Sequence, residues 1–218
     1  MRGISANRTL PAFVAAILLL TTGPAAGQDV GLTAGLASSG NPELPNPTSY
    51  GAEAWFGDTE WRVRLTWMRY EDETLKPGRV CAAPGIGCTI ETVDTSVRLT
   101  GLRLEMLRTL YHAGPLTVAA GGGGSFSQLV ATATGSSGRR AALHLPHTGQ
   151  LGFLGSTALT VRPMARVPLL LVTGLSGHWM LWNGCVDPDD PTRGDAPFCG
   201  WDLITEVRAG ITVSLPRR

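Results

Sequence analysis

The sequence is poor in charge, and what it lacks excludes several classes of protein. Charged residues make up 16% of its 218 positions, against about 25% in an ordinary soluble domain, and the only lysine is Lys76. The formal net charge of +1 leaves no basic surplus to attract nucleic acid. Beyond residue 27 no run reaches the roughly 18 apolar residues of a membrane-spanning helix. An apolar chain without such a helix can still enter a membrane as strands closed into a barrel.

The first 27 residues have the order of a secretory signal peptide. Arg2 and Arg8 supply positive charge, residues 10–20 are apolar (LPAFVAAILLL), and residues 21–27 are mostly small. The apolar run is too short for a membrane-spanning helix, which needs about 20 residues. We therefore predict that residues 1–27 are removed and that residues 28–218 form one exported domain. The exported part has 16 basic and 17 acidic residues.

Eight segments of the exported part alternate polar and apolar residues with period two. This pattern predicts strands with one apolar and one polar face. In the clearest segment, 200–215, Leu203, Thr205 and Val207 lie on the mostly apolar face, and Glu206 and Arg208 lie on the polar face. The predicted strands are 28–38, 48–56, 60–70, 94–111, 115–130, 148–162, 167–182 and 200–215.

Two places depart from regular alternation. Val97 and Leu99 are out of phase with Leu102 and the apolar residues that follow it, which predicts a β-bulge near Thr100-Gly101. The run Gly121 to Gly124 lacks the Lys and Ser/Thr of a phosphate-binding loop. We expect a kink or a close backbone approach there instead.

Connections of two lengths alternate along the chain. Residues 57–59, 112–114 and 163–166 are short turns, whereas 39–47, 71–93, 131–147 and 183–199 are predicted to be long loops. This alternation is typical of a membrane barrel with short periplasmic turns and longer external loops, and it places both termini on the short-turn side. A soluble lipocalin-like barrel is the alternative. The polar faces are rich in Gly, Ser and Thr and poor in charge, which favours the membrane barrel.

With these residues in view, the chain resembles the small outer-membrane β-barrel superfamily around the OmpA transmembrane domain and OmpX. The resemblance covers about residues 28–215 and is mostly one of pattern. Its one motif is the terminal-strand assembly signal, polar-x-Gly-x-x-apolar-x-apolar, which is matched by Arg208, Gly210, Val213 and Leu215. The chain departs from the family at its end, where residues 216–218 (PRR) follow in place of a final aromatic residue.

The resemblance implies an all-β fold, an eight-stranded antiparallel up-and-down transmembrane β-barrel. It also implies an outer-membrane location with periplasmic termini. The implied partners are outer-membrane lipid and, during insertion, the barrel-assembly machinery. The expected role is non-enzymatic, either structural in the envelope or in surface contacts through four long external loops. The alternatives are a narrow transport barrel and a membrane-embedded lipid-modifying hydrolase.

Seven charged residues are predicted to point into the barrel: Glu53, Arg62, Arg64, Arg103, Glu105, Glu206 and Arg208. The interior of an eight-stranded barrel is just wide enough for side chains, so we expect these charges to pair as an internal plug. A conduit for small ions or protons is the alternative. The arginines outnumber the acids by one, and we expect backbone carbonyls or a polar side chain to satisfy the extra guanidinium.

Two pairs of residues are candidates for reactive sites. Ser176 and His178 lie two apart on an inward face, and a hydrolase would use them as nucleophile and base. No acid completes that set, so we predict no catalytic residue. His144 and His147 lack further ligands, so we predict neither a metal site nor a cofactor.

All four cysteines lie in predicted long loops. Cys81 and Cys88 share one loop, and Cys185 and Cys199 share another. In an oxidising compartment these residues indicate disulfides. Of the three possible pairings we favour the two local ones, Cys81–Cys88 and Cys185–Cys199.

Overall fold

The computed structural model describes residues 27–39, 46–83, 86–138, 149–164, 167–182 and 200–215. Residues 1–26 of the predicted signal peptide lie outside this set. The strands are β1 (Gly27–Ser39), β2 (Thr48–Gly57), β3 (Trp61–Ala83), β4 (Ile86–Ala113), β5 (Leu116–Gly135), β6 (Gly149–Val161), β7 (Leu169–Trp182) and β8 (Gly200–Leu215). The described residues contain no helix long and apolar enough to cross a membrane.

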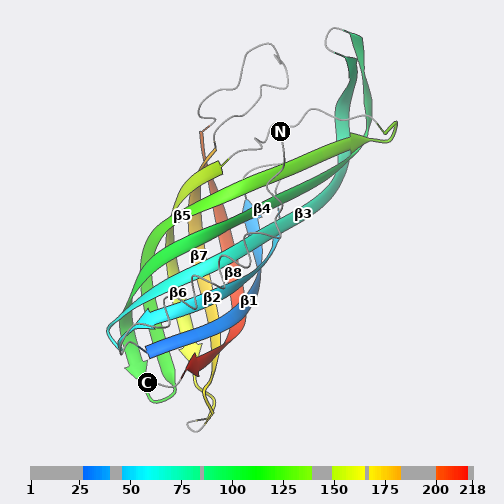
Figure 1. Ribbon diagram of the computed structural model, residues 1–218. Coiled ribbons are helices and arrows are strands. Elements are labelled where there is room, and N and C mark those ends of the chain that lie inside the picture. Colours follow the sequence, from blue (N-terminus) through cyan, green and yellow to red (C-terminus); the bar gives the residue numbers. More distant parts are fainter. Residues whose placement is uncertain are drawn as a thin grey trace.

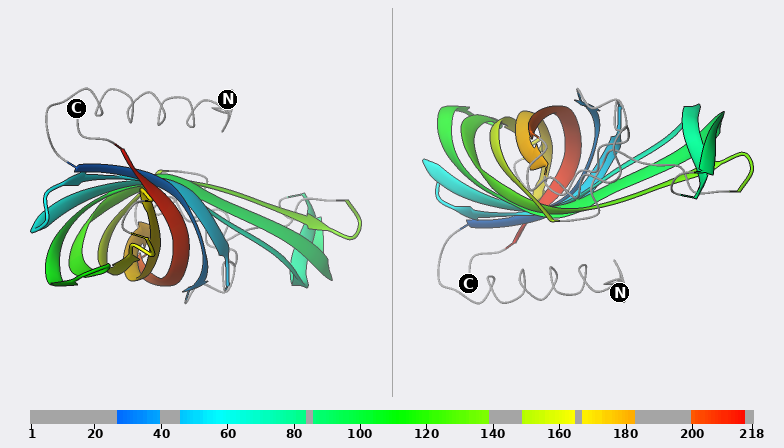
Figure 2. Two further views of the ribbon diagram at one scale, coloured as in Figure 1. Left: turned by 90° about the horizontal axis from the view of Figure 1, so that it is seen from below. Right: turned by 90° about the horizontal axis from the view of Figure 1, so that it is seen from above.

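The eight strands pair in sequence order and close into one barrel (Figure 1). Every neighbouring pair is antiparallel, and β1 closes the ring on β8 from Gln28 opposite Leu215 to Ser39 opposite Ile204. The start of β1 and the end of β8 lie beside the short turns (Figure 1). The ring is plain when the molecule is viewed along its axis (Figure 2). The predicted fold, an eight-stranded antiparallel up-and-down barrel, is confirmed.

Alternation along each strand sends one set of side chains inward and the other outward. On β8, Ile204, Glu206 and Arg208 are buried inside, whereas Val207 is 59% exposed on the outside. On β1 the outward Leu32 is 71% exposed. The outer surface is therefore apolar, the reverse of a soluble barrel.

The predicted long loop at 71–93 is wrong. β3 continues to Ala83 and β4 begins at Ile86, so the two strands form one long hairpin that stays paired from Glu71–Arg98 to Ala83–Ile86. The predicted loop contains Lys-Pro-Gly at 76–78, and proline and glycine are uncommon inside strands. Pro77 is tolerated because β3 has passed the end of β2 there, and proline is compatible with an edge strand.

The hairpin and the upper part of β5 form a three-stranded sheet that projects beyond the ring. β2 pairs with β3 only as far as Glu71, and β6 pairs with β5 only from Gln128. β5 nevertheless continues to Gly135, paired with β4. In the views along the axis this sheet extends well to one side of the barrel (Figure 2). We call residues 72–83, 86–97 and 129–135 the projecting sheet.

The bulge predicted near Thr100-Gly101 is also wrong. Pairing between β4 and β5 is continuous there and is irregular between Thr109 and Tyr111 instead. Val97 and Leu99 point inward in the same phase as Arg103 and are almost completely buried. The apparent phase change arises because part of the barrel interior is apolar.

Gly121 to Gly124 sit where neighbouring strands approach closely. A Cβ at Gly121 would lie 1.9 Å from the carbonyl oxygen of Met106, and one at Gly123 would lie 1.8 Å from that of Leu104. Side chains at these positions would push β5 away from β4. The close backbone approach predicted for this run is therefore present.

The disulfide between Cys81 and Cys88 is our first testable prediction. The two residues are direct cross-strand partners in the hairpin, and such partners have Cα atoms about 4.5–5.5 Å apart, within the range of a disulfide. Reduction is expected to loosen the hairpin tip and leave the barrel folded. Non-reducing peptide mapping checks the pairing, and a Cys81–Cys185 peptide would contradict it. Cys185 and Cys199 lie outside the described residues.

Candidate functional site

The centre of the barrel holds a buried ion pair between neighbouring strands. Arg64 on β3 donates two hydrogen bonds to Glu105 on β4, from Nε to Oε2 at 2.7 Å and from Nη2 to Oε1 at 2.6 Å. Ser156 on β6 also donates to Glu105, at 2.5 Å. Both charged side chains are fully buried. This two-pronged geometry fixes both side chains against each other on the neighbouring strands β3 and β4.

Glu206 on β8 is the second centre of the interior. Its Oε2 accepts hydrogen bonds from Arg103 at 2.8 Å and from the Tyr70 hydroxyl at 2.9 Å. Its Oε1 accepts from Ser49 at 2.6 Å, and Ser176 donates more weakly to Oε2 at 3.3 Å. Arg103 also donates to the Tyr70 hydroxyl. One carboxylate thus ties together side chains of β2, β3, β4, β7 and β8.

Arg62 has a partner that the sequence analysis missed. Asp29 on β1 accepts a hydrogen bond from Arg62 near the short-turn end. We expected a carbonyl or neutral group to satisfy the surplus guanidinium, and this was wrong because Asp29 brings the inward acids level with the arginines. Asp29 alternates with Val30 and Leu32 at the edge of a predicted strand, so its facing was visible in the sequence.

Glu53 and Arg208 are the least directly paired of the predicted interior charges. Within the described residues neither oxygen of Glu53 accepts a hydrogen bond, although the residue is completely buried. Arg208 Nη2 lies 3.7 Å from Glu105 Oε2, so Arg208 joins the central ion pair through charge. All seven predicted charges therefore point into the barrel, and Arg62 is the most accessible of them.

Apolar clusters lie on both sides of the charged layer. Toward the short turns the cluster is Trp55, Leu107, Ala119, Ala158 and Val172. Toward the opposite end it is Ala37, Met68, Tyr70, Val97, Leu99, Leu129, Met180 and Ile204. The guanidinium groups of Arg62 and Arg64 lie 4.9 and 4.8 Å from the Trp55 ring. Charged side chains that lie between two buried apolar clusters are typical of a packed interior and not of an aqueous pore.

Ser176 and His178 each contact a different partner. His178 Nε2 lies 2.5 Å from the hydroxyl of Ser125 on β5, whereas Ser176 binds Glu206. Gly152 makes room for the imidazole, since a Cβ there would lie 2.5 Å from Nε2. His178 Nδ1 has no partner in the described part of the chain, so no acid orients the ring. This geometry lacks the nucleophile–base–acid arrangement of a hydrolase.

No metal-binding cluster occurs among the described residues. His144 and His147 fall outside them. The assembly-signal residues all lie on β8, where Arg208 points inward and Val213 and Leu215 lie on the outer surface. Their role in assembly stays a prediction.

Two charged rims border the apolar outer surface. At the short-turn end Arg108 lies over the Trp61 ring at 5.7 Å and 3.7 Å from Glu60. At the other end Arg98 donates to Glu71 at 2.9 Å. Among the described strands, the outward side chains between the rims are uncharged except Arg69, which pairs with Glu71 of the second rim. On β4, residues 99–107 lie between Arg98 and Arg108. This span agrees with the length of a membrane-crossing strand, which is about 9–11 residues.

Glu91 joins β4 to the end of β5 in the projecting sheet. The hydroxyl and backbone N–H of Ser137, together with the Thr89 hydroxyl, lower the pKa of Glu91 to about 2. The amide hydrogen bond from Ser137 measures 2.9 Å.

A pH titration of this contact is our second prediction. Because the pKa of Glu91 is lowered on folding, the contact is intact above its ordinary value near 4.5 and is lost as pH falls through about 2. The Ser137 amide resonance is expected to move with a midpoint near 2, and Glu91→Gln should remove that titration. A midpoint near 4.5 in the wild-type protein would contradict the contact.

No protein-family model matches the sequence, and no curated protein matches it significantly. Its likeness to known proteins is structural. Neisserial surface protein A (NspA) superimposes with a TM-score of 0.53 and 13% identity, covering 86% of this chain and 97% of that one. A major outer membrane protein from Thermus thermophilus superimposes with a TM-score of 0.53 and 15% identity, covering 88% and 100%.

The chain has the fold of the small outer-membrane β-barrels. The resemblance inferred from its strand pattern is therefore confirmed for the fold. At 13–15% identity the likeness carries the fold and no finer property. What this barrel does must be argued from its own interior and surface.

Proposed function

We propose that this protein is an integral outer-membrane barrel with a closed lumen that makes surface contacts through its projecting sheet. The membrane placement is supported by the apolar outer surface, whose charged side chains, among the described residues, gather at two rims that also carry aromatic side chains. The rim spacing matches the hydrocarbon thickness that a tilted strand crosses. With both strand ends on the short-turn side, the projecting sheet lies on the external side.

The projecting sheet is the observation that carries the contact role. Leu75 and Ile90 are 74% and 78% exposed, although both lie well beyond the rim marked by Arg98. Water solvates such side chains poorly, so an exposed group of them favours a contact surface. Within the described residues β3 and β5 each have β4 on one side only in this sheet, and such strand edges can pair with another extended chain.

The contact role can be tested by removing the hairpin of the projecting sheet and keeping the barrel. Residues 73–96 are replaced by Asn-Gly, a two-residue turn that joins the cross-strand partners Asp72 and Val97. The heat-dependent shift in gel mobility reports whether the shortened barrel folds. Settling of expressing cells and their retention on protein-coated surfaces report contact. Wild-type cells should exceed the shortened variant in at least one assay, and equal behaviour in both would overturn the contact role.

The closed lumen is our third prediction. Because buried ion pairs lie between two apolar clusters in the described part of the lumen, conductance of the protein in planar bilayers is expected to stay near background. The control is a porin of known conductance inserted under the same conditions. A steady ion-selective current that Arg208→Ala abolishes would support the transport alternative instead.

A further inference from the structure

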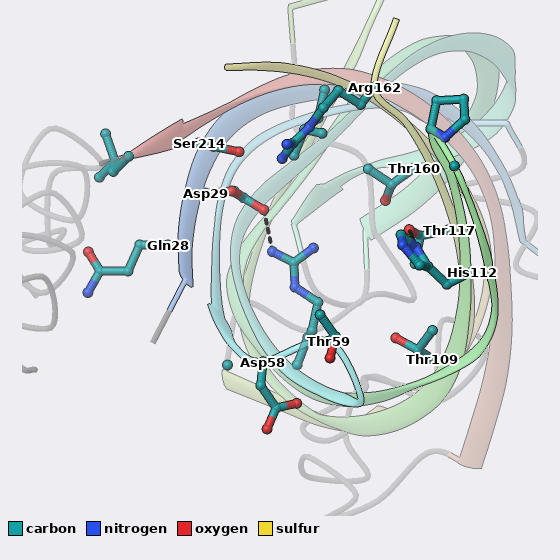
Figure 3. A pocket seen from close by; sticks show the side chains of 16 residues that line it. Gln28, Asp29, Asp58, Thr59, Thr109, His112, Thr117, Thr160, Arg162 and Ser214 are labelled. Atoms are coloured by element: carbon teal, nitrogen blue, oxygen red, sulfur yellow. Dashed lines mark hydrogen bonds and ion pairs between the residues drawn. The ribbon is translucent and has the colours of Figure 1, made fainter. Parts of the chain in front are cut away.

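A blind pocket of about 420 Å³ opens at the short-turn end of the barrel (Figure 3). It is lined by residues from the ends of β1, β4, β5, β6, β7 and β8 and from the turn between β2 and β3. Arg62 lies at its inner end, stacked 4.9 Å above the Trp55 ring and hydrogen-bonded to Asp29. The apolar cluster that contains Trp55 lies beneath, so the pocket ends there.

Each of the two carboxylates at this pocket already has one oxygen engaged by protein donors. Asp29 accepts from Arg62. Asp58 accepts the backbone N–H groups of Glu60 and Trp61 through Oδ1, both at 2.8 Å. These backbone donors lower the pKa of Asp58, so its carboxylate is charged at neutral pH and keeps these two hydrogen bonds.

The groups left over are mostly donors. The Arg162 guanidinium makes no hydrogen bond or ion pair within the described residues, and its side chain is among those that line the pocket (Figure 3). The hydroxyls of Thr109 and Ser214 are buried and have no partner in the described part of the chain. Arg62 holds further N–H groups beyond the one that Asp29 accepts, since a guanidinium carries five donors. The formal charges of the two arginines and two aspartates cancel. Within the described residues, the arginine N–H groups that remain without a partner nevertheless outnumber the carboxylate oxygens that remain without one.

We propose that this pocket binds a small soluble anion through a phosphate or carboxylate group. The charged oxygens of such a group accept hydrogen bonds, and arginine donors match them in pairs. Arg62 is held in place by Trp55 and Asp29 before any ligand arrives, which lowers the entropic cost of binding. The volume falls within the range of about 300–1,000 Å³ that is usual for small-molecule sites. The site lies at the opposite end of the barrel from the projecting sheet and is independent of the contact role.

The test follows the Nε–Hε resonances of the arginines in the ¹⁵N-labelled full chain in micelles. Inorganic phosphate and acetate are the anionic probes, and glucose is the neutral one. Phosphate or acetate is expected to shift Arg62 and Arg162 in a saturable manner. Arg162→Gln should weaken binding about tenfold, the effect of losing one charge-assisted hydrogen bond. Because Arg162 is exposed, this variant should keep the heat-dependent gel shift of the folded barrel.

Arg108→Gln is the matched control, because Arg108 lies at the same end of the barrel but on its outer surface. It should leave anion affinity unchanged. Saturation by phosphate alone assigns a phosphorylated ligand, and saturation by acetate alone assigns a carboxylate. Equal loss in both variants would indicate general surface charge and overturn the site. An equal response to glucose, or none to either anion, would overturn it as well.

Discussion

Glu206→Ala is expected to destabilise the barrel by about 3–5 kcal/mol, the usual result of leaving a buried charge without its partner. Glu206 accepts hydrogen bonds from Arg103, Tyr70 and Ser49, so its removal leaves a buried guanidinium and two buried hydroxyls short of an acceptor. Arg103 is 1% exposed and cannot turn to solvent. Equilibrium urea unfolding in lipid vesicles measures the loss.

A double variant separates the lost ion pair from the lost packing. Arg103→Met combined with Glu206→Leu removes both charges and keeps much of the volume, so it should recover most of the stability that Glu206→Ala loses. Ser176→Ala is the control, since Ser176 contributes only the weak 3.3 Å hydrogen bond, and it should cost well under the single Glu206 change. If Glu206→Ala unfolded at the wild-type urea concentration, the carboxylate would have no structural role.

Val207→Arg is expected to cost about 2–4 kcal/mol, the penalty for an arginine on the lipid face near the bilayer midplane. Val207 lies halfway along β8, points outward, and is flanked in register by Leu36 and Leu175. The same urea series measures the change.

Leu171→Arg tests whether this penalty depends on depth. Leu171 is the third residue of β7, near the short-turn rim, so its arginine can reach the interface and should cost less than that at Val207. Equal costs at the two positions, or a silent Val207→Arg, would show that this surface does not lie in lipid.

The sequence by itself determined that eight strands form the barrel, which way their side chains face within it, and hence the class of fold. Period-two alternation is local, so residues such as Glu206 and Val207 reveal their opposite faces without knowledge of what they touch. Short turns between alternating segments make antiparallel neighbours nearly obligatory. The same facing rule placed all seven interior charges inside the barrel, and it would also have placed Asp29.

Only the tertiary structure decided which groups meet inside the barrel and where pairing stops. The partners of Glu206 come from four other strands, because strand tilt and stagger set which side chains share a level in the lumen. Val97 and Leu99 look out of phase when apolar side chains are expected outside, whereas in the structure both belong to the buried cluster that includes Leu129. The hairpin beyond Glu71 persists because β3 and β4 supply each other's hydrogen bonds, and no local propensity around Pro77 indicates that.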